Sequence, residues 1–95
     1  MADWQSHEHL EDHFRNHGPE VGARTIAEYD ASARSLLARD DVLVFGYVDE
    51  KTGLNRLGLY DTETRHFTGI SDDERWIVTH FRAAWGYIRD LMGSD

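Results

Sequence analysis

The sequence predicts an α+β domain: two N-terminal helices packed on a four-stranded antiparallel meander sheet, with a short C-terminal helix. Apolar residues recur with helical spacing up to about residue 39, and short apolar runs separated by turn residues follow from residue 42. A chain of 95 residues is long enough for only one core. We therefore expect one domain over residues 1–95, with residues 1–5 flexible.

The first helix is expected over residues 6–17, because Ser6 can cap its start and Gly18–Pro19 would stop it. One face carries residues at i, i+4 and i+7: Leu10, Phe14 and His17. An adjoining stripe carries residues at i, i+4 and i+8: His9, His13 and His17. The second helix begins with a capping box, Thr25 and Glu28, and extends to about Arg39.

The periodicity changes at Asp40–Asp41, and four strands are predicted over residues 42–49, 55–61, 65–70 and 76–82. Strict alternation in the last strand would divide its side chains between two faces. One face would hold Trp76, Val78, His80 and Arg82, and the other Ile77, Thr79 and Phe81. A short helix is expected after this strand, with one apolar side formed by Ala84, Trp85, Ile88 and Leu91.

The composition excludes several classes of protein. The chain has no cysteine, which rules out disulfide scaffolds, Cys-ligated zinc, iron–sulfur clusters and thiol catalysis. No apolar run approaches the roughly 20 residues that span a bilayer, and the polar, acidic N-terminus is unlike a signal peptide. We therefore expect a cytoplasmic protein with no membrane partner.

The net charge of −8 is unevenly distributed along the chain. Residues 1–50 hold four arginines against eleven acids, while residues 51–95 hold six basic residues against seven acidic ones. This balance argues against extended, nonspecific binding of duplex DNA, which depends on clustered positive charge. It leaves room for a small phosphate site, because nine of the ten basic residues are arginine.

The histidine stripe is one candidate site. His9 and His13 have the i, i+4 spacing that can share a metal ion. Three histidines on one straight helix span about 12 Å, so His17 could not reach the same ion. A polar helix face beside the core explains the stripe as well, and we expect no metal and no cofactor.

A second candidate combines His17 with polar residues of the last two strands. At the edge of the core, His17 could act as a general base or could instead cap the end of its helix. The polar residues that a hairpin of the last two strands would bring close are Arg65, His66, Thr79, His80 and Arg82. Histidine, arginine and a hydroxyl suit metal-free cleavage of RNA, although an ordinary solvated sheet face has the same composition.

The order of four motifs is more specific than any one of them. LEDHFRNHGPEVGA at 10–23, TIAEY at 25–29, LYDTETRHF at 59–67 and WIVTHFR at 76–82 together resemble a family of bacterial RNase toxin domains. These domains belong to the barnase–EndoU–colicin–RelE group of metal-independent ribonucleases and usually form the C-termini of polymorphic and contact-dependent toxins. The resemblance covers about residues 10–91.

The resemblance implies a metal-independent endoribonuclease that leaves a 2′,3′-cyclic phosphate and a 5′-hydroxyl. His17 would transfer the proton, with Glu20 orienting it or ordering the loop and His80 as a supporting second proton-transfer group. Arg65 and Arg82 would bind the scissile phosphate, and Thr79 would hydrogen-bond to it or to the 2′-OH. The expected partners are RNA, with tRNA favoured by family analogy, and a neutralising immunity protein or antitoxin.

Two other readings remain open. The chain is acidic and departs from the family pattern at Val21, Thr62 and Ala83, which is consistent with a catalytically inactive binding module or regulator on the same fold. In that case some of its large aromatic residues, which include Trp4, Trp76, Trp85 and Tyr87, could serve a homodimer instead of the core. The third reading is a metal-binding regulator that uses the His9–His13 pair.

Overall fold

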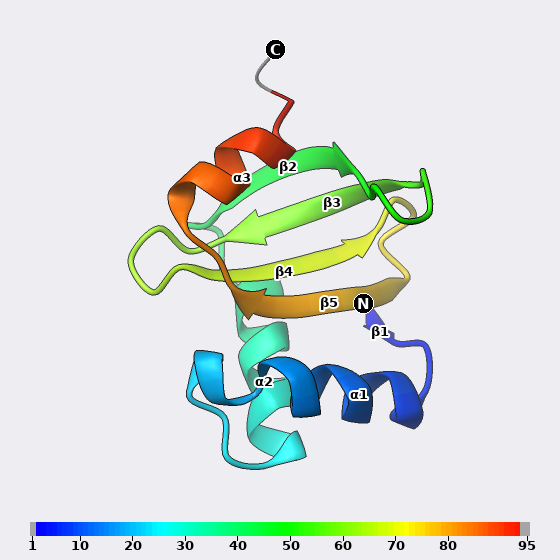
Figure 1. Cartoon of the computed structure of the whole chain (residues 1–95), viewed down its shortest axis with the longest axis vertical. Coiled ribbons are helices and arrows are strands. Elements are labelled where there is room, and N and C mark those ends of the chain that lie inside the picture. The colour runs from blue at the N-terminus through cyan, green and yellow to red at the C-terminus, as the bar shows by residue number, and fades with distance from the viewer. Residues whose placement is uncertain (1, 94–95) are drawn as a thin grey trace.

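The computed structural model describes residues 2–93, which form three α-helices, one 3-10 helix and five strands (Figure 1). In chain order the elements are β1 (Asp3–Trp4), α1 (His7–His17), η1 (Pro19–Val21), α2 (Ile26–Leu37), β2 (Leu43–Val48), β3 (Asn55–Tyr60), β4 (His66–Ser71), β5 (Trp76–Arg82) and α3 (Trp85–Leu91). The predicted α+β class is confirmed, and the predicted helices and strands match to within about two residues at each end.

The two long helices begin where side chains satisfy free backbone N–H groups. The Ser6 hydroxyl accepts from His9 N at 3.0 Å at the start of α1, and the Thr25 hydroxyl accepts from Glu28 N at 3.1 Å at the start of α2. The Glu28 carboxylate accepts from Arg24 N at 2.7 Å, so it bonds one residue before the position a capping box would use.

The sheet has the strand order β1-β5-β4-β3-β2. Strands β2 to β5 form the expected antiparallel meander, with Phe45 opposite Gly58 and Phe67 opposite Phe81. The prediction of a four-stranded antiparallel sheet is wrong in one respect, because β1 adds a fifth strand parallel to β5. The two-residue strand is too short to show a period of two, so the sequence gives no pattern for it.

The N-terminal segment packs against the rest of the domain. Ala2 and Trp4 are buried in the main core, and the Trp4 indole N–H donates to Asp30 Oδ1 at 2.9 Å. Arg34 of α2 reaches back to this segment, donating to the Ala2 carbonyl and pairing with Asp3. Residues 2–4 are therefore tied to both the sheet and α2.

The helices cover both faces of the sheet. Figure 1 shows α2 passing behind the strands, α1 along the β5 edge, and α3 on the opposite face near β2. The main core lies between the sheet and the N-terminal helices and includes Tyr29, Leu36 and Ile77. A smaller core lies under α3 and includes Phe67 and Ile88. Helix α3 thus covers part of the face opposite the N-terminal helices.

Strand β5 does not alternate as predicted. Gly69 pairs with Thr79 but Ile70 pairs with Ile77, so Val78 has no partner and forms a β-bulge. The extra residue places Ile77 and His80 on the same face, toward α2, while Thr79 and Phe81 face the α3 side. Our assignment of Val78 and His80 to one face is therefore wrong.

Among the described helices, none combines the length and the apolar character that crossing a membrane requires.

Candidate functional site

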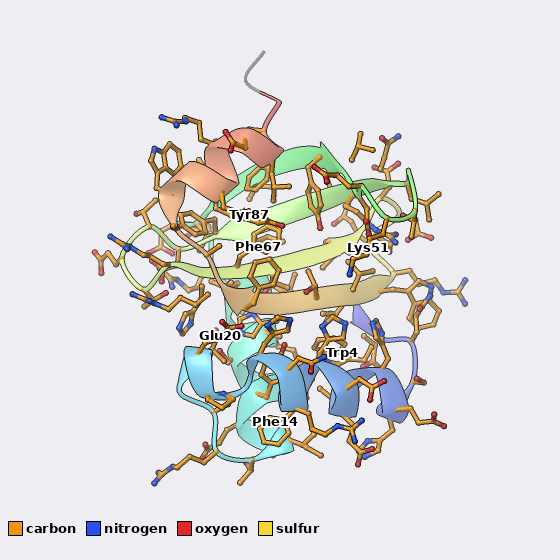
Figure 2. All side chains as sticks on the ribbon, viewed as in Figure 1. Trp4, Phe14, Glu20, Lys51, Phe67 and Tyr87 are labelled. Atoms are coloured by element: carbon orange, nitrogen blue, oxygen red, sulfur yellow. The ribbon has the colours of Figure 1, made fainter. Side chains whose placement is uncertain are left out.

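A cavity with a volume of about 520 Å³ lies on the α3 side of the sheet. Its lining combines residues of α1, β2, β4, β5 and α3 with the β2–β3 turn. The lining residues are His13, Tyr47, Val48, Asp49, Glu50, Lys51, Phe67, Val78, Thr79, Phe81, Tyr87, Asp90 and Leu91. Figure 2 shows Phe67, Tyr87 and Lys51 over the strands, apart from Trp4 and Phe14 among the N-terminal helices.

Two glycines leave space for the aromatic floor of this cavity. A Cβ on Gly58 would lie 2.7 Å from Phe45 and 2.8 Å from Phe67. A Cβ on Gly69 would collide with the Tyr47 hydroxyl and would lie 3.0 Å from Thr79 Cγ2. Because both glycines lack side chains, large rings can lie flat against the strands.

His17 and Glu20 form a pair at the rim, beside β5. The His17 ring lies 5.4 Å from the Phe81 ring between centroids, and its Nδ1 contacts Glu20 Oε1 at hydrogen-bonding range. Both side chains are partly exposed, at 33% and 41%. In a neutral imidazole, a carboxylate at Nδ1 favours the tautomer that carries its hydrogen there, with the lone pair on Nε2.

The turn after α1 fixes this pair. Gly18 follows His17 where a Cβ would lie 2.6 Å from the Phe14 carbonyl oxygen, so no larger residue fits without movement. Pro19 starts the 3-10 helix that carries Glu20, and Gly22 ends it at φ 76°, in the left-handed region. The G-P-x-x-G sequence therefore sets the position of Glu20 against His17.

The other stripe histidines pack between α1 and the sheet. Their rings form a chain with centroid distances of 4.6 Å for His9–His13 and 5.9 Å for His13–His17, and Trp4 lies 5.6 Å from both His9 and His13. Burial, with the neighbouring histidines, lowers the pKa of His13 to about 4. The Nδ1 atoms of His9 and His13 are buried without a hydrogen-bond partner. No group of three potential ligands among residues 2–93 could hold a metal ion.

His80 is fully buried. Its Nε2 lies 2.8 Å from the Ser32 hydroxyl, and its Nδ1 lies 2.9 Å from the Thr68 hydroxyl and 3.0 Å from the Phe67 carbonyl. The Phe67 carbonyl can only accept, which places the hydrogen on Nδ1 and makes Ser32 the donor to Nε2. Burial lowers the pKa of His80 to about 4, so the ring is neutral at pH 7 and has no access to a substrate.

Arg65 and Arg82 lie at the other end of the site, where β4 begins and β5 ends. Arg82 pairs in register with His66, and the Arg65 carbonyl accepts from Ala83 N at 2.8 Å. Arg65 and Arg82 are both exposed, and neither forms an ion pair among the described residues. Their charges are free to meet an anion at this end of the hairpin.

The structure thus divides the predicted site residues into three places. His17 and Glu20 form the rim pair, Arg65 and Arg82 occupy the hairpin end, and Thr79 lies on the cavity floor two residues before Phe81. Phe81 connects the rim pair to the cavity, because it lines the cavity and contacts the His17 ring. His80 lies behind the sheet, bonded to Ser32, with its ring 5.8 Å from the His66 ring between centroids.

Sequence reasoning missed the residues that make the cavity distinctive: Tyr47, Asp49, Tyr87 and Asp90. The alternation of the first predicted strand, residues 42–49, could have placed Tyr47 with Phe45 on one face. Nothing in the sequence indicates that α3 folds back over this face and carries Tyr87 and Asp90 to the β2–β3 turn. No family model matches the chain, and comparison with curated proteins gives no match either.

Proposed function

We propose that the protein is a metal-independent endoribonuclease in which His17 transfers the proton. The observation that carries this proposal is the His17–Glu20 pair, which is partly exposed beside an aromatic hollow, with no hydrogen bond to His17 Nε2 from residues 2–93. The arrangement of an imidazole held by a carboxylate is the one that general-base catalysis requires. The resemblance to RNase toxin domains is consistent with it but adds only analogy.

In the proposed reaction, His17 Nε2 takes the proton of a ribose 2′-OH. The 2′-oxygen attacks the adjacent phosphorus, and the bond from phosphorus to the 5′-oxygen breaks. The leaving oxygen takes a proton from solvent, which gives a 2′,3′-cyclic phosphate and a 5′-hydroxyl. His80 has no part in the proposed reaction, because it is buried and both its ring nitrogens are engaged.

Arg65 and Arg82 supply the positive charge that the crowded phosphate needs in the transition state. The RNA strand would cross β5 from the hairpin end toward the rim pair, with a base over Phe81. Thr79 would meet the strand where it reaches the cavity. We keep tRNA as the first substrate to test, the cytoplasm as the expected compartment, and an immunity protein or antitoxin as the expected partner.

The test is incubation of the protein with total tRNA in EDTA, beside His17→Gln, Glu20→Gln and the control His7→Gln. His7 starts α1 with its side chain 72% exposed, so its replacement changes a histidine away from the rim. We expect cyclic-phosphate ends with the wild type and the control, and a loss of about 100-fold or more with His17→Gln. Full activity in a folded His17→Gln variant would remove His17 from the mechanism.

A second candidate, a binding module without activity, is favoured by the charge of the cavity. Three acidic residues line it against one lysine, and among residues 2–93 no arginine does. Such a surface repels phosphate. Intact RNA at high protein concentration between pH 5 and 8, with the fold confirmed by circular dichroism, would favour this candidate over the nuclease.

A further inference from the structure

The walls of the cavity are a continuous series of aromatic rings. Centroid distances are 5.8 Å for Tyr47–Phe67, 5.2 Å for Phe67–Phe81 and 5.8 Å for Phe81–Tyr87. The rings come from β2, β4, β5 and α3, so the tertiary fold assembles them around one hollow. Adjacent rings meet at interplanar angles between 55° and 67°, and Phe67 is only 1% exposed, so the ring surface open to the hollow belongs to Tyr47, Phe81 and Tyr87. The face of an aromatic ring is negative and attracts a cation that sheds its water readily.

The carboxylates at the cavity also favour binding of a cation. Asp49 and Glu50 project from the β2–β3 turn and Asp90 from α3, while Lys51 is the only lysine or arginine in the described lining. Asp49 has a distant partner, Arg56 at 3.8 Å, and neither Glu50 nor Asp90 forms an ion pair within the described chain. Burial raises the pKa of Tyr87, and nearby Glu50 and Asp49 add to the rise, which places these acids close to the aromatic wall.

We propose that this cavity binds an alkylated ammonium ion, such as a quaternary ammonium headgroup or the methylated side chain of a lysine. An alkylated ammonium is large, weakly hydrated and positive, which suits aromatic walls together with carboxylates at the opening. A volume of about 520 Å³ accommodates such a group with part of its chain. An unmodified ammonium holds its water more strongly and would gain less from the rings.

This proposal does not depend on the ribonuclease. The ring walls and acids extend from Phe81 toward the β2–β3 turn and α3, whereas the rim pair and the arginines lie beyond β5 and at the hairpin end. Cation binding and RNA cleavage can each be measured in the absence of the other. A protein that binds the cation and leaves RNA intact would support this inference and refute the nuclease.

The experiment is calorimetric titration with choline and with its neutral isostere 3,3-dimethylbutan-1-ol. We expect choline to bind at least about tenfold more tightly than the isostere, and more weakly as salt rises. A peptide carrying Nε-trimethyllysine, beside the same peptide with plain lysine, distinguishes the two sources of the group. Binding of the trimethylated peptide alone would assign a protein partner, and binding of choline alone a small molecule.

Two variants change residues that line the cavity, and a third variant is the matched control. Tyr87→Ala removes a ring that is 49% exposed, and Asp90→Asn removes a carboxylate without changing its shape. Each should weaken choline binding by about tenfold, whereas Glu63→Gln, an exposed acid on the β3–β4 turn outside the cavity, should leave it unchanged. Equal affinity for the isostere, unchanged binding by both cavity variants, or no binding of either cation would overturn the proposal.

Discussion

Acid sensitivity of the fold should trace to His80. The ring is fully buried between Ser32, Thr68 and the Phe67 carbonyl, and burial lowers its pKa to about 4 from 6.5. Because the folded state resists protonation, the unfolded chain binds the extra proton more readily once the pH falls below about 6.5. The contribution of neutral His80 to stability is therefore full above pH 6.5 and is lost progressively down to about pH 4.

The structure gives the size of this effect. With pKa values of 6.5 unfolded and about 4 folded, His80 alone lowers the free energy of unfolding by about 2 kcal/mol between pH 7.5 and pH 5. Burial also lowers the pKa values of His9, His13 and His66, so the total loss for the wild type should be larger. Asp61 affects stability in a lower pH range, because Arg39 holds the pKa of its carboxyl at about 2. The contribution of Asp61 to the free energy of unfolding is lost only below about pH 4.

The assay is urea unfolding followed by far-ultraviolet circular dichroism at half-unit steps from pH 7.5 to 5. His80→Gln keeps an amide that can bond to the surrounding polar groups but cannot titrate in this range. The free energy of unfolding of this variant will be lower than that of the wild type at pH 7.5. Its decrease between pH 7.5 and 5, however, should be smaller than the wild-type decrease by about 2 kcal/mol. Replacing exposed His7 by Gln should leave the wild-type slope intact. A His80→Gln slope equal to the wild type would refute the assignment.

Three further changes should have measurable effects. Ile88→Ala empties a fully buried position under α3 and should lower the free energy of unfolding by about 3 kcal/mol, measured in urea. Thr25→Ala removes the cap of α2 and should cost about 1 kcal/mol in the same assay, whereas Thr62→Ala on an exposed turn should cost much less. His17→Gln should reduce tRNA cleavage by about 100-fold or more without changing the urea midpoint greatly, and a comparable loss in His7→Gln would contradict the role of His17.

Much of the fold follows from local signals in the sequence. Ser6 and Thr25 cap helices that begin where these residues predict, because each hydroxyl accepts from a backbone N–H three residues later. The meander follows from alternating apolar runs and from turns that place Gly53 at φ 73°. These features depend on residues close together in the chain, so the local sequence pattern predicts them.

The errors arise where distant segments decide the outcome. Strand β1 forms because Trp4 packs in the core and its indole N–H donates a hydrogen bond to Asp30, 26 residues away. The bulge at Val78 depends on how β5 meets β4, and a single unpaired residue reverses which side chains face α2. Strict alternation does not predict this bulge, so it places His80 on the face of Val78, which lines the cavity, whereas the His80 ring bonds to Ser32 and Thr68.

The bulge also separates the roles of the polar residues on β5. Without it, Ile77, Thr79 and Phe81 would share one face, and His80 would lie with Val78 opposite them. With it, His80 turns toward Ser32 and becomes a buried, neutral structural group, while Thr79 and Phe81 open onto the cavity beside Val78. Phe81 then contacts the His17 ring from the cavity side. His80, the only histidine of β5, is thus buried. In the proposed reaction the proton is therefore transferred by His17 of α1, which contacts Glu20 at the rim.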